Sequence, residues 1–206
     1  EMVNAILSGR KTQTRRIMGN QPAGQDLETV HVRHNDDFNF QWYGNLGESS
    51  YFPCPLGKPG DQLWVREAFQ GPLFDYEQME SYLEDSAKFE SPEYCVYRAD
   101  GNTAPEFVDA DDNLHCKWRP SIHMPRWASR INLLITGVRV ERLQDISEQD
   151  ARAEGVKAWR GPAEELVGGK LAFFELWDSI YGQKEGENWQ ANPWVWVINF
   201  ERMEAK

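Results

Sequence analysis

The chain has 206 residues, of which 40% are hydrophobic and 13% aromatic, enough apolar surface to fill the core of one domain. Its formal net charge of −11 at pH 7 argues against a general duplex-DNA binder, because neutralising phosphates requires a basic face. The sequence has no apolar run long enough to span a membrane, no charged-then-apolar leader, and no close CxxC pair among its three cysteines. We therefore expect a single cytoplasmic domain with reduced thiols.

The first predicted element is a short amphipathic helix, because apolar residues recur at helical spacing between Met2 and Leu7. Gly9 is placed to end this helix in a left-handed cap, and the Thr-x-Thr pattern after Lys11 favours a strand that runs to Ile17. Strict alternation along that strand puts Lys11 and Thr14 on opposite faces. A site shared by the two residues therefore requires a bend between them, or requires Lys11 to lie in the turn.

The remaining predicted elements alternate strands with short helices. Aromatic residues with period two at residues 38–43 indicate an inserted hairpin, and further strands are expected at residues 62–69, 93–98, 131–143 and 194–200, with a bulge at Gly137. Helical segments are expected at residues 77–89 and 124–129, from the N-cap Ser147 to Gly155, and from Pro162 through Leu166 to Ile180. Period-two spacing predicts that Trp194, Trp196 and Ile198 share a face with Leu133 and Ile135. Because the strands do not repeat as βαβ units, we expect an α+β protein with helices appended to a small barrel.

Four sequence blocks stand out in order along the chain. They read GRKTQTRR (9–16), KPGDQLWVRE (58–67), ISEQDARAEGV (146–156) and PWVWVINF (193–200). Together they resemble the ASCH superfamily, whose first motif is approximately Gly-x-Lys-x-x-Thr-x-Arg, and in particular the longer ASCH proteins of bacteria and their prophages. The resemblance implies one PUA-like domain over residues 1–206, with a small β-barrel, flanking helices and long insertions at about residues 20–58 and 70–117.

The resemblance also implies a catalytic site. In the small bacterial ASCH amidohydrolases, which remove the acetyl group from N4-acetylcytidine, the motif lysine is the proton acceptor, the threonine three residues later is the nucleophile, and a helix-end glutamate is the proton donor. These roles correspond here to Lys11, Thr14 and Glu154. A threonine hydroxyl needs such a base, and a lysine can serve when burial or neighbouring cations lower its pKa. The implied activity is deacylation of an N4-acylated cytosine base, without metal or cofactor.

Charged residues near the motifs are expected to bind the substrate. They are Arg10, Arg15, Arg16, Arg66 and Glu67, and Glu67 is the second choice for the acid. The small enzymes have a single arginine followed by an acidic residue where this chain has Arg15 and Arg16. The additional cation favours a phosphate-bearing nucleotide or a single-stranded RNA end over an uncharged nucleoside.

Ordinary structural explanations and two other functions stay open. A lysine after a helix end is favoured by the helix dipole, a threonine is a common strand residue, and a glutamate at a helix end is usually exposed. The other functions are a non-catalytic module that binds single-stranded RNA or a nucleotide, and an ASCH-type ribonuclease. An enclosed pocket around the three residues favours the hydrolase, and an open basic groove favours RNA. No metal site is expected, because the spacing of Cys95, His115, Cys116 and His123 matches no compact zinc pattern.

Overall fold

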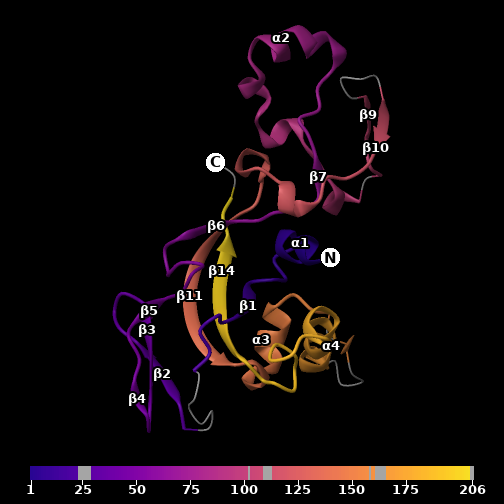
Figure 1. Cartoon of the computed structure of the whole chain (residues 1–206). Helices are drawn as coiled ribbons and strands as arrows, with labels where there is room; N and C mark the ends of the chain where they lie inside the picture. The colour runs from indigo at the N-terminus through magenta and orange to yellow at the C-terminus, as the bar shows by residue number, and fades with distance from the viewer. Residues whose placement is uncertain (23–28, 102, 109–112, 158, 161–165, 205–206) are drawn as a thin grey trace.

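A curled antiparallel sheet of half-barrel shape forms the centre of the molecule (Figure 1). Its strands are hydrogen-bonded in the order β1 (Gln13–Ile17), β14 (Trp194–Arg202), β11 (Asn132–Arg142) and β6 (Gln62–Trp64). The computed structural model describes residues 1–22, 29–101, 103–108, 113–157, 159–160 and 166–204. Both long strands pair antiparallel to each other, and the register shifts between Ile135 and Gly137, which confirms the bulge expected at that glycine.

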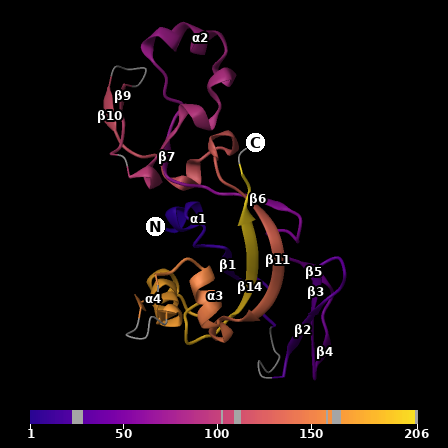
Figure 2. The same cartoon turned by 180° about the vertical axis from the view of Figure 1, so that it is seen from behind.

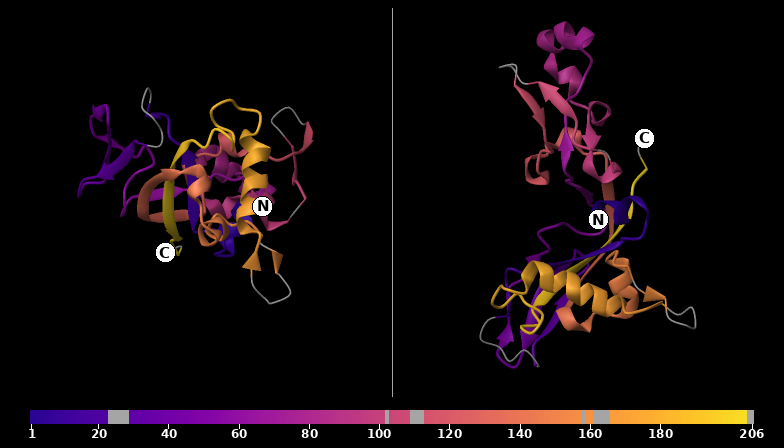
Figure 3. Two further views of the ribbon diagram at one scale, coloured as in Figure 1. Left: turned by 90° about the horizontal axis from the view of Figure 1, so that it is seen from below. Right: turned by 90° about the vertical axis from the view of Figure 1, so that its right-hand side faces the viewer.

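Strand β14 is buried on both faces because apolar residues occupy successive positions along it. Trp194, Trp196 and Ile198 pack on one face, whereas Val195 and Val197 pack on the other. The first face is covered by a second antiparallel sheet, and the second face by helices α3 (Glu148–Ala153) and α4 (Gly169–Tyr181). Figure 3 shows the small sheet and α4 on opposite sides of the central sheet.

The second sheet supplies aromatic rings to the core beneath it. Its strands are β2 (His31–His34), β3 (Asn39–Gly44), β4 (Gly47–Glu48) and β5 (Phe52–Pro53). The Phe40 and Trp196 ring centroids lie 4.8 Å apart, and those of Trp42 and Trp194 lie 5.0 Å apart, both pairs in edge-on geometry. These contacts join the two sheets through large buried side chains, the main source of hydrophobic stabilisation in a small core.

Two helices border the region that contains the first and third sequence blocks. Helix α1 (Met2–Leu7) is followed by Gly9 at φ 71°, which confirms the expected left-handed turn. In α3 the Ser147 hydroxyl accepts a hydrogen bond from the Asp150 backbone N–H, which confirms the expected N-cap. The chain leaves α3 at Gly155, whose φ is +89°.

A lobe of short elements lies beyond the β6 end of the central sheet (Figures 1 and 2). It contains β7 (Phe69–Gln70) paired with β8 (Val96–Tyr97), β9 (Glu106–Val108) paired with β10 (Leu114–Cys116), and helix α2 (Met79–Glu84). Its 3-10 turns are Tyr76–Gln78, Ser86–Phe89, Pro92–Tyr94, Arg98–Asp100, Ser121–His123 and Arg126–Ala128, and a seventh follows β11 at Leu143–Asp145. A small core of Phe69, Tyr97, Met124 and Ala128 holds the lobe together.

Several predicted elements are shorter than expected. The helix expected at residues 77–89 is broken at Asp85, whose extended backbone and side-chain acceptance from the Ala87 N–H start a separate 3-10 turn. The strand expected at residues 62–69 is divided into β6 at Gln62–Trp64 and β7, which begins at Phe69. The strand expected at residues 93–98 is limited to Val96–Tyr97.

Two further expectations were wrong. The fourth α-helix begins at Gly169 rather than Pro162; Leu166 belongs to a short hairpin of β12 (Trp159–Arg160) and β13 (Leu166–Val167), and Pro162 lies outside the described residues. Ile135 packs with Trp194, Trp196 and Ile198 as expected, whereas Leu133 packs with Phe200 in a neighbouring cluster next to α1. The expected α+β class is confirmed. Among the described residues, none of the helices is both long and apolar enough to cross a membrane.

Candidate functional site

A cavity of about 280 Å³ lies between α1, β1, the end of α3 and α4, and we call it the Lys11 pocket. Apolar side chains of α1 and α4 form its walls, while Lys11, Thr14, Arg16, Arg66 and Glu154 supply polar groups. A second cavity of about 330 Å³ adjoins it, shares Lys11, Thr14, Arg16 and Arg66, and extends towards β6 and β11. The residues of the first, second and third sequence blocks therefore meet at one place.

Lys11 lies between the turn at Gly9 and the start of β1, and its side chain lines the same cavity as Thr14. Its side chain is only 7% exposed, and its Nζ donates to the Glu154 carboxylate at 2.7 Å and to the Glu154 carbonyl at 2.8 Å. Burial lowers the pKa of Lys11 below 10.5, and the charges of Arg16 and Arg15 lower it further, whereas Glu154 opposes the shift. This environment favours the neutral amine more than water does.

Backbone geometry at Gly155 brings Lys11 and Glu154 together. The two residues form an isolated β-bridge, and the Lys11 N–H donates to the Ala5 carbonyl at 2.9 Å. A Cβ at position 155 would lie 2.8 Å from Lys11 Cβ and 2.9 Å from Ala5 Cβ. Only glycine allows the chain to pass this close at a positive φ.

Thr14 borders both cavities and is half-buried in β1, where it pairs with Ile198. The expected convergence of Lys11, Thr14 and Glu154 on one cavity is therefore present in the structure. Among the described residues, however, no hydrogen bond joins Lys11 Nζ to the Thr14 hydroxyl, because two of the Lys11 donors are directed at Glu154.

Glu154 is 3% exposed and lies between two cations. One carboxylate oxygen accepts from Lys11 and the other lies 3.4 Å from Arg15 Nη1. Arg15 is also buried, and it pairs with Glu141 and lies 3.7 Å from Asp150. Arg15 lines the Lys11 pocket, but its buried guanidinium is held by the carboxylates of Glu141, Asp150 and Glu154, so its charge is largely balanced within the fold.

Asp150 closes this network on the helix-covered face of the sheet. Its carboxylate accepts from Gln13 at 3.0 Å, from Ser147 at 2.8 Å and from Arg139 at 3.1 Å. Burial by itself raises the pKa of Asp150, but the hydrogen bonds from Gln13 and Ser147 and the charges of Arg139 and Arg15 outweigh it. The pKa therefore lies below 3.8, and the ionised form is stabilised by folding.

The other expected binding residues separate into two groups. Arg16 and Arg66 line both cavities, and Arg10 lies close by, its Nε donating to the Gly155 carbonyl at 3.0 Å. Glu67 does not line either cavity. Its buried carboxylate instead accepts from Arg130 at 2.9 and 3.1 Å, so the structure gives no support for Glu67 as a substrate ligand or an alternative acid.

Sequence reasoning missed the aromatic wall of the Lys11 pocket. Phe173, Trp177 and Tyr181 occupy every fourth position of α4, and their successive ring centroids lie 5.8 and 4.6 Å apart. Spacing of four residues places side chains on one helix face. The signal in the sequence was this repeat of aromatic residues at every fourth position.

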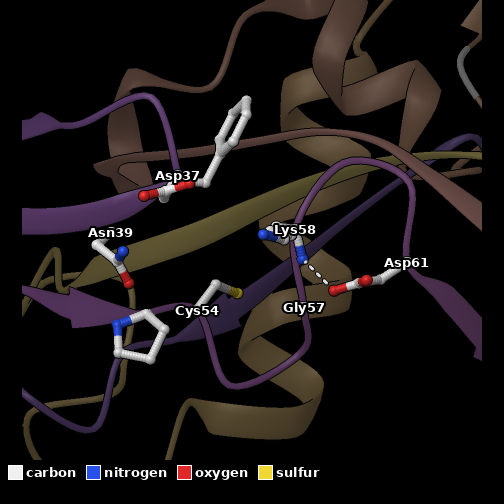
Figure 4. Close-up of a pocket in the computed structure, with 8 residues that line it drawn as sticks. Asp37, Asn39, Cys54, Gly57, Lys58 and Asp61 are labelled. Atoms are coloured by element: carbon white, nitrogen blue, oxygen red, sulfur yellow. Dashed lines mark hydrogen bonds between the residues drawn. The ribbon is translucent and has the colours of Figure 1, made fainter.

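A larger cavity of about 450 Å³ lies elsewhere, between β3, β5 and the turn before β6 (Figure 4). The Cys54 thiol points into it, and the Lys58 backbone N–H donates to the Asp61 carboxylate at 2.8 Å. Burial raises the pKa of Cys54, which leaves the thiol protonated and weakly nucleophilic. Within the part of the chain that the structure describes, no group of three or more His, Cys, Asp or Glu residues is arranged to hold a metal ion.

Comparisons with models of known protein families, with curated proteins and with solved structures found no match for this chain.

Proposed function

We propose that this chain is an ASCH-type, PUA-like protein that hydrolyses the amide of an N4-acylated cytosine base. The observation that carries the proposal is the buried Lys11–Glu154 ion pair beside Thr14 in one cavity. A buried lysine–glutamate ion pair with a purely structural role does not require a cavity beside it. Here the pair borders a pocket that is also lined by the Thr14 hydroxyl-bearing side chain.

The shape of the site favours a small molecule over a polymer. Small-ligand pockets are typically about 300–1,000 Å³ and mostly apolar with a few polar groups, and the Lys11 pocket with its adjoining cavity fits that description. The rings of Phe173, Trp177 and Tyr181 offer flat apolar surfaces for a nucleobase. The adjoining cavity leaves space on the other side of Thr14 for the acyl group.

In the proposed reaction, Lys11 and Glu154 begin as a neutral amine and a neutral acid. Transfer of one proton along their 2.7 Å hydrogen bond produces this state, and burial of Lys11 favours it. Lys11 Nζ then takes the proton of the Thr14 hydroxyl as its oxygen attacks the amide carbon. Glu154 gives its proton to the leaving amine, the acyl group stays on Thr14, and water activated by the same pair releases it as a carboxylic acid.

Paired substitutions test these roles with N4-acetylcytidine as substrate and chromatography of cytidine as the readout. Lys11→Arg keeps the charge near Glu154 but removes the base, because a guanidinium stays protonated, and it should lower kcat by about 10²–10⁴-fold. Thr14→Val removes only the hydroxyl and should abolish turnover, whereas Thr14→Ser should retain part of it. Thr12→Val, at an exposed neighbouring threonine, is the matched control and should leave turnover unchanged.

The same panel separates the alternatives. Substrates should also include the acetylated nucleotide and a short single-stranded RNA, because a ribonuclease releases shortened RNA and a binding module releases nothing. If wild type forms no Lys11-dependent cytidine from any of these substrates, the hydrolase proposal is wrong. A ligand that quenches tryptophan fluorescence in wild type but less in Trp177→Phe, without being cleaved, would then favour the binding module.

A further inference from the structure

Arg15 and Arg16 are neighbours in β1 but face opposite sides of the sheet. Arg15 is buried and paired with Glu141 and Glu154, so its charge is already neutralised within the fold. Arg16 is exposed and borders both the Lys11 pocket and the adjoining cavity. Arg15 also lines the Lys11 pocket, but its charge is already paired, so Arg16 is the better placed of the two to bind an anionic group.

Arg66 joins Arg16 from a segment about fifty positions later in the chain, directly after β6. Its guanidinium lies 4.7 Å from the centre of the Trp64 ring, and one nitrogen is 3.4 Å from the Ile122 carbonyl. The ring contact restricts the arginine without using its hydrogen-bond donors. Most of its N–H groups remain available at the pocket.

Arg16 and Arg66 are distinguished by their shared position, because both line the Lys11 pocket and the adjoining cavity. Arg15, Arg33, Arg130 and Arg139 each pair with a carboxylate, so their charges are already balanced within the fold. In the described segments, neither Arg16 nor Arg66 forms an ion pair with a carboxylate. Two cations left without acidic partners at the edge of one pocket indicate that the ligand supplies the anion.

We propose that Arg16 and Arg66 bind a phosphate group, so that the preferred ligand of the Lys11 pocket is a free nucleotide rather than an uncharged nucleoside. Guanidinium groups match phosphate oxygens with paired hydrogen bonds, and two of them can hold one phosphate from two sides. The cytosine base in this inference rests on the proposed function, whereas the phosphate site rests on the arginines. An extended RNA chain would need further cations along a groove, which a net charge of −11 disfavours.

Equilibrium binding of unmodified ligands tests the phosphate site without requiring catalysis. Cytidine, cytidine 5′-monophosphate and a 5′-phosphorylated tetranucleotide should be titrated against wild type, Arg16→Gln, Arg66→Gln and Arg33→Gln. Wild type should bind the monophosphate at least about tenfold more tightly than cytidine, as expected for hydrogen bonds to a charged group. Arg16→Gln and Arg66→Gln should each remove most of that difference while leaving the affinity for cytidine unchanged.

Arg33→Gln is the matched control, because it removes one exposed positive charge from β2, away from either cavity, and should change neither affinity. Equal affinities of wild type for cytidine and its monophosphate would overturn the phosphate site, as would variants that weaken both ligands alike. Tighter binding of the tetranucleotide than of the monophosphate would assign the phosphate to an RNA end and overturn the free nucleotide. If the monophosphate binds through Arg16 and Arg66 but the protein hydrolyses no N4-acylated cytosine, only the proposed function is contradicted.

Discussion

The role of each residue in β1 depends on the face of the strand to which its side chain points. Gln13 and Arg15 face the helices, where carboxylates from α3 and β11 neutralise the buried guanidinium. Thr14 and Arg16 face the cavities instead. One strand therefore supplies both the supports of Glu154 and the groups proposed to meet substrate, and a register shift of one residue would exchange them.

The same network makes acid stability depend on Asp150. Because the folded state lowers its pKa below 3.8, its contribution to stability is fully present above about pH 4 and is lost as the pH falls through the folded value. Asp150→Asn should reduce the free energy of unfolding at pH 7 by about 1 kcal/mol. As the pH falls below about 4 the difference should shrink, because protonation of the carboxylate then increasingly favours the unfolded chain.

Urea denaturation at several pH values measures this difference. Asp36→Asn is the control, because Asp36 is exposed in the turn between β2 and β3 and should give no comparable change. A stability gap between wild type and Asp150→Asn that stays constant from pH 7 to pH 3 would contradict the role assigned to the carboxylate.

At the scale of elements, the end of α3 is fixed by a close approach of three chain segments. Gly155 has a positive φ, and a Cβ at this position would overlap with Lys11 and Ala5. The close packing of α1, the segment before β1 and the end of α3 therefore requires a residue without a side chain here. Gly168, before α4, also has a positive φ of +80° but has open space around the missing Cβ. A side chain at position 168 would therefore add backbone strain alone, whereas a side chain at position 155 would add both backbone strain and steric overlap.

Alanine substitutions at both positions test this distinction. Gly168→Ala should cost about 1–2 kcal/mol, the strain of an L-residue in the left-handed region. Gly155→Ala should cost about 1–3 kcal/mol more, because Lys11 and Ala5 must also move apart. Urea midpoints measure both, and equal costs at the two positions would show that the close approach contributes nothing.

The elements also show what local sequence can and cannot predict. Ser147 acts on its own helix through its hydroxyl, and Gly9 and Gly137 act through their backbone, so the cap, the turn and the bulge are local features, and all three are present as expected. Predicted lengths were wrong where an alternative local bond interrupts an element, as at Asp85. The juxtaposition of Lys11 with Glu154 came from the motif resemblance, since nothing in either local pattern specifies a contact across 143 positions.

At the scale of the whole molecule, a buried ion pair connects the central sheet to the lobe that contains α2. Glu67, between β6 and β7, is 3% exposed, and Arg130 binds it while also donating to Asp100 at 2.7 and 2.9 Å. The Arg130 guanidinium also lies 3.9 Å from the centre of the Tyr97 ring. The sequence alone does not indicate this role for Glu67, because its partner Arg130 lies 63 positions away in the chain.

A double-mutant cycle tests whether this ion pair couples the two parts of the molecule. Arg130→Met leaves the Glu67 carboxylate buried without its partner and should cost about 3–5 kcal/mol. Adding Glu67→Gln should recover part of that loss, because a neutral amide is less costly to bury, so the double variant should be more stable than the sum of single effects predicts. Arg126→Met, which removes an exposed guanidinium hydrogen-bonded to Asn132, is the control and should cost less than about 1 kcal/mol. Additive single effects, or an Arg130→Met variant as stable as wild type in urea, would mean that the lobe is held by its apolar contacts rather than by this pair.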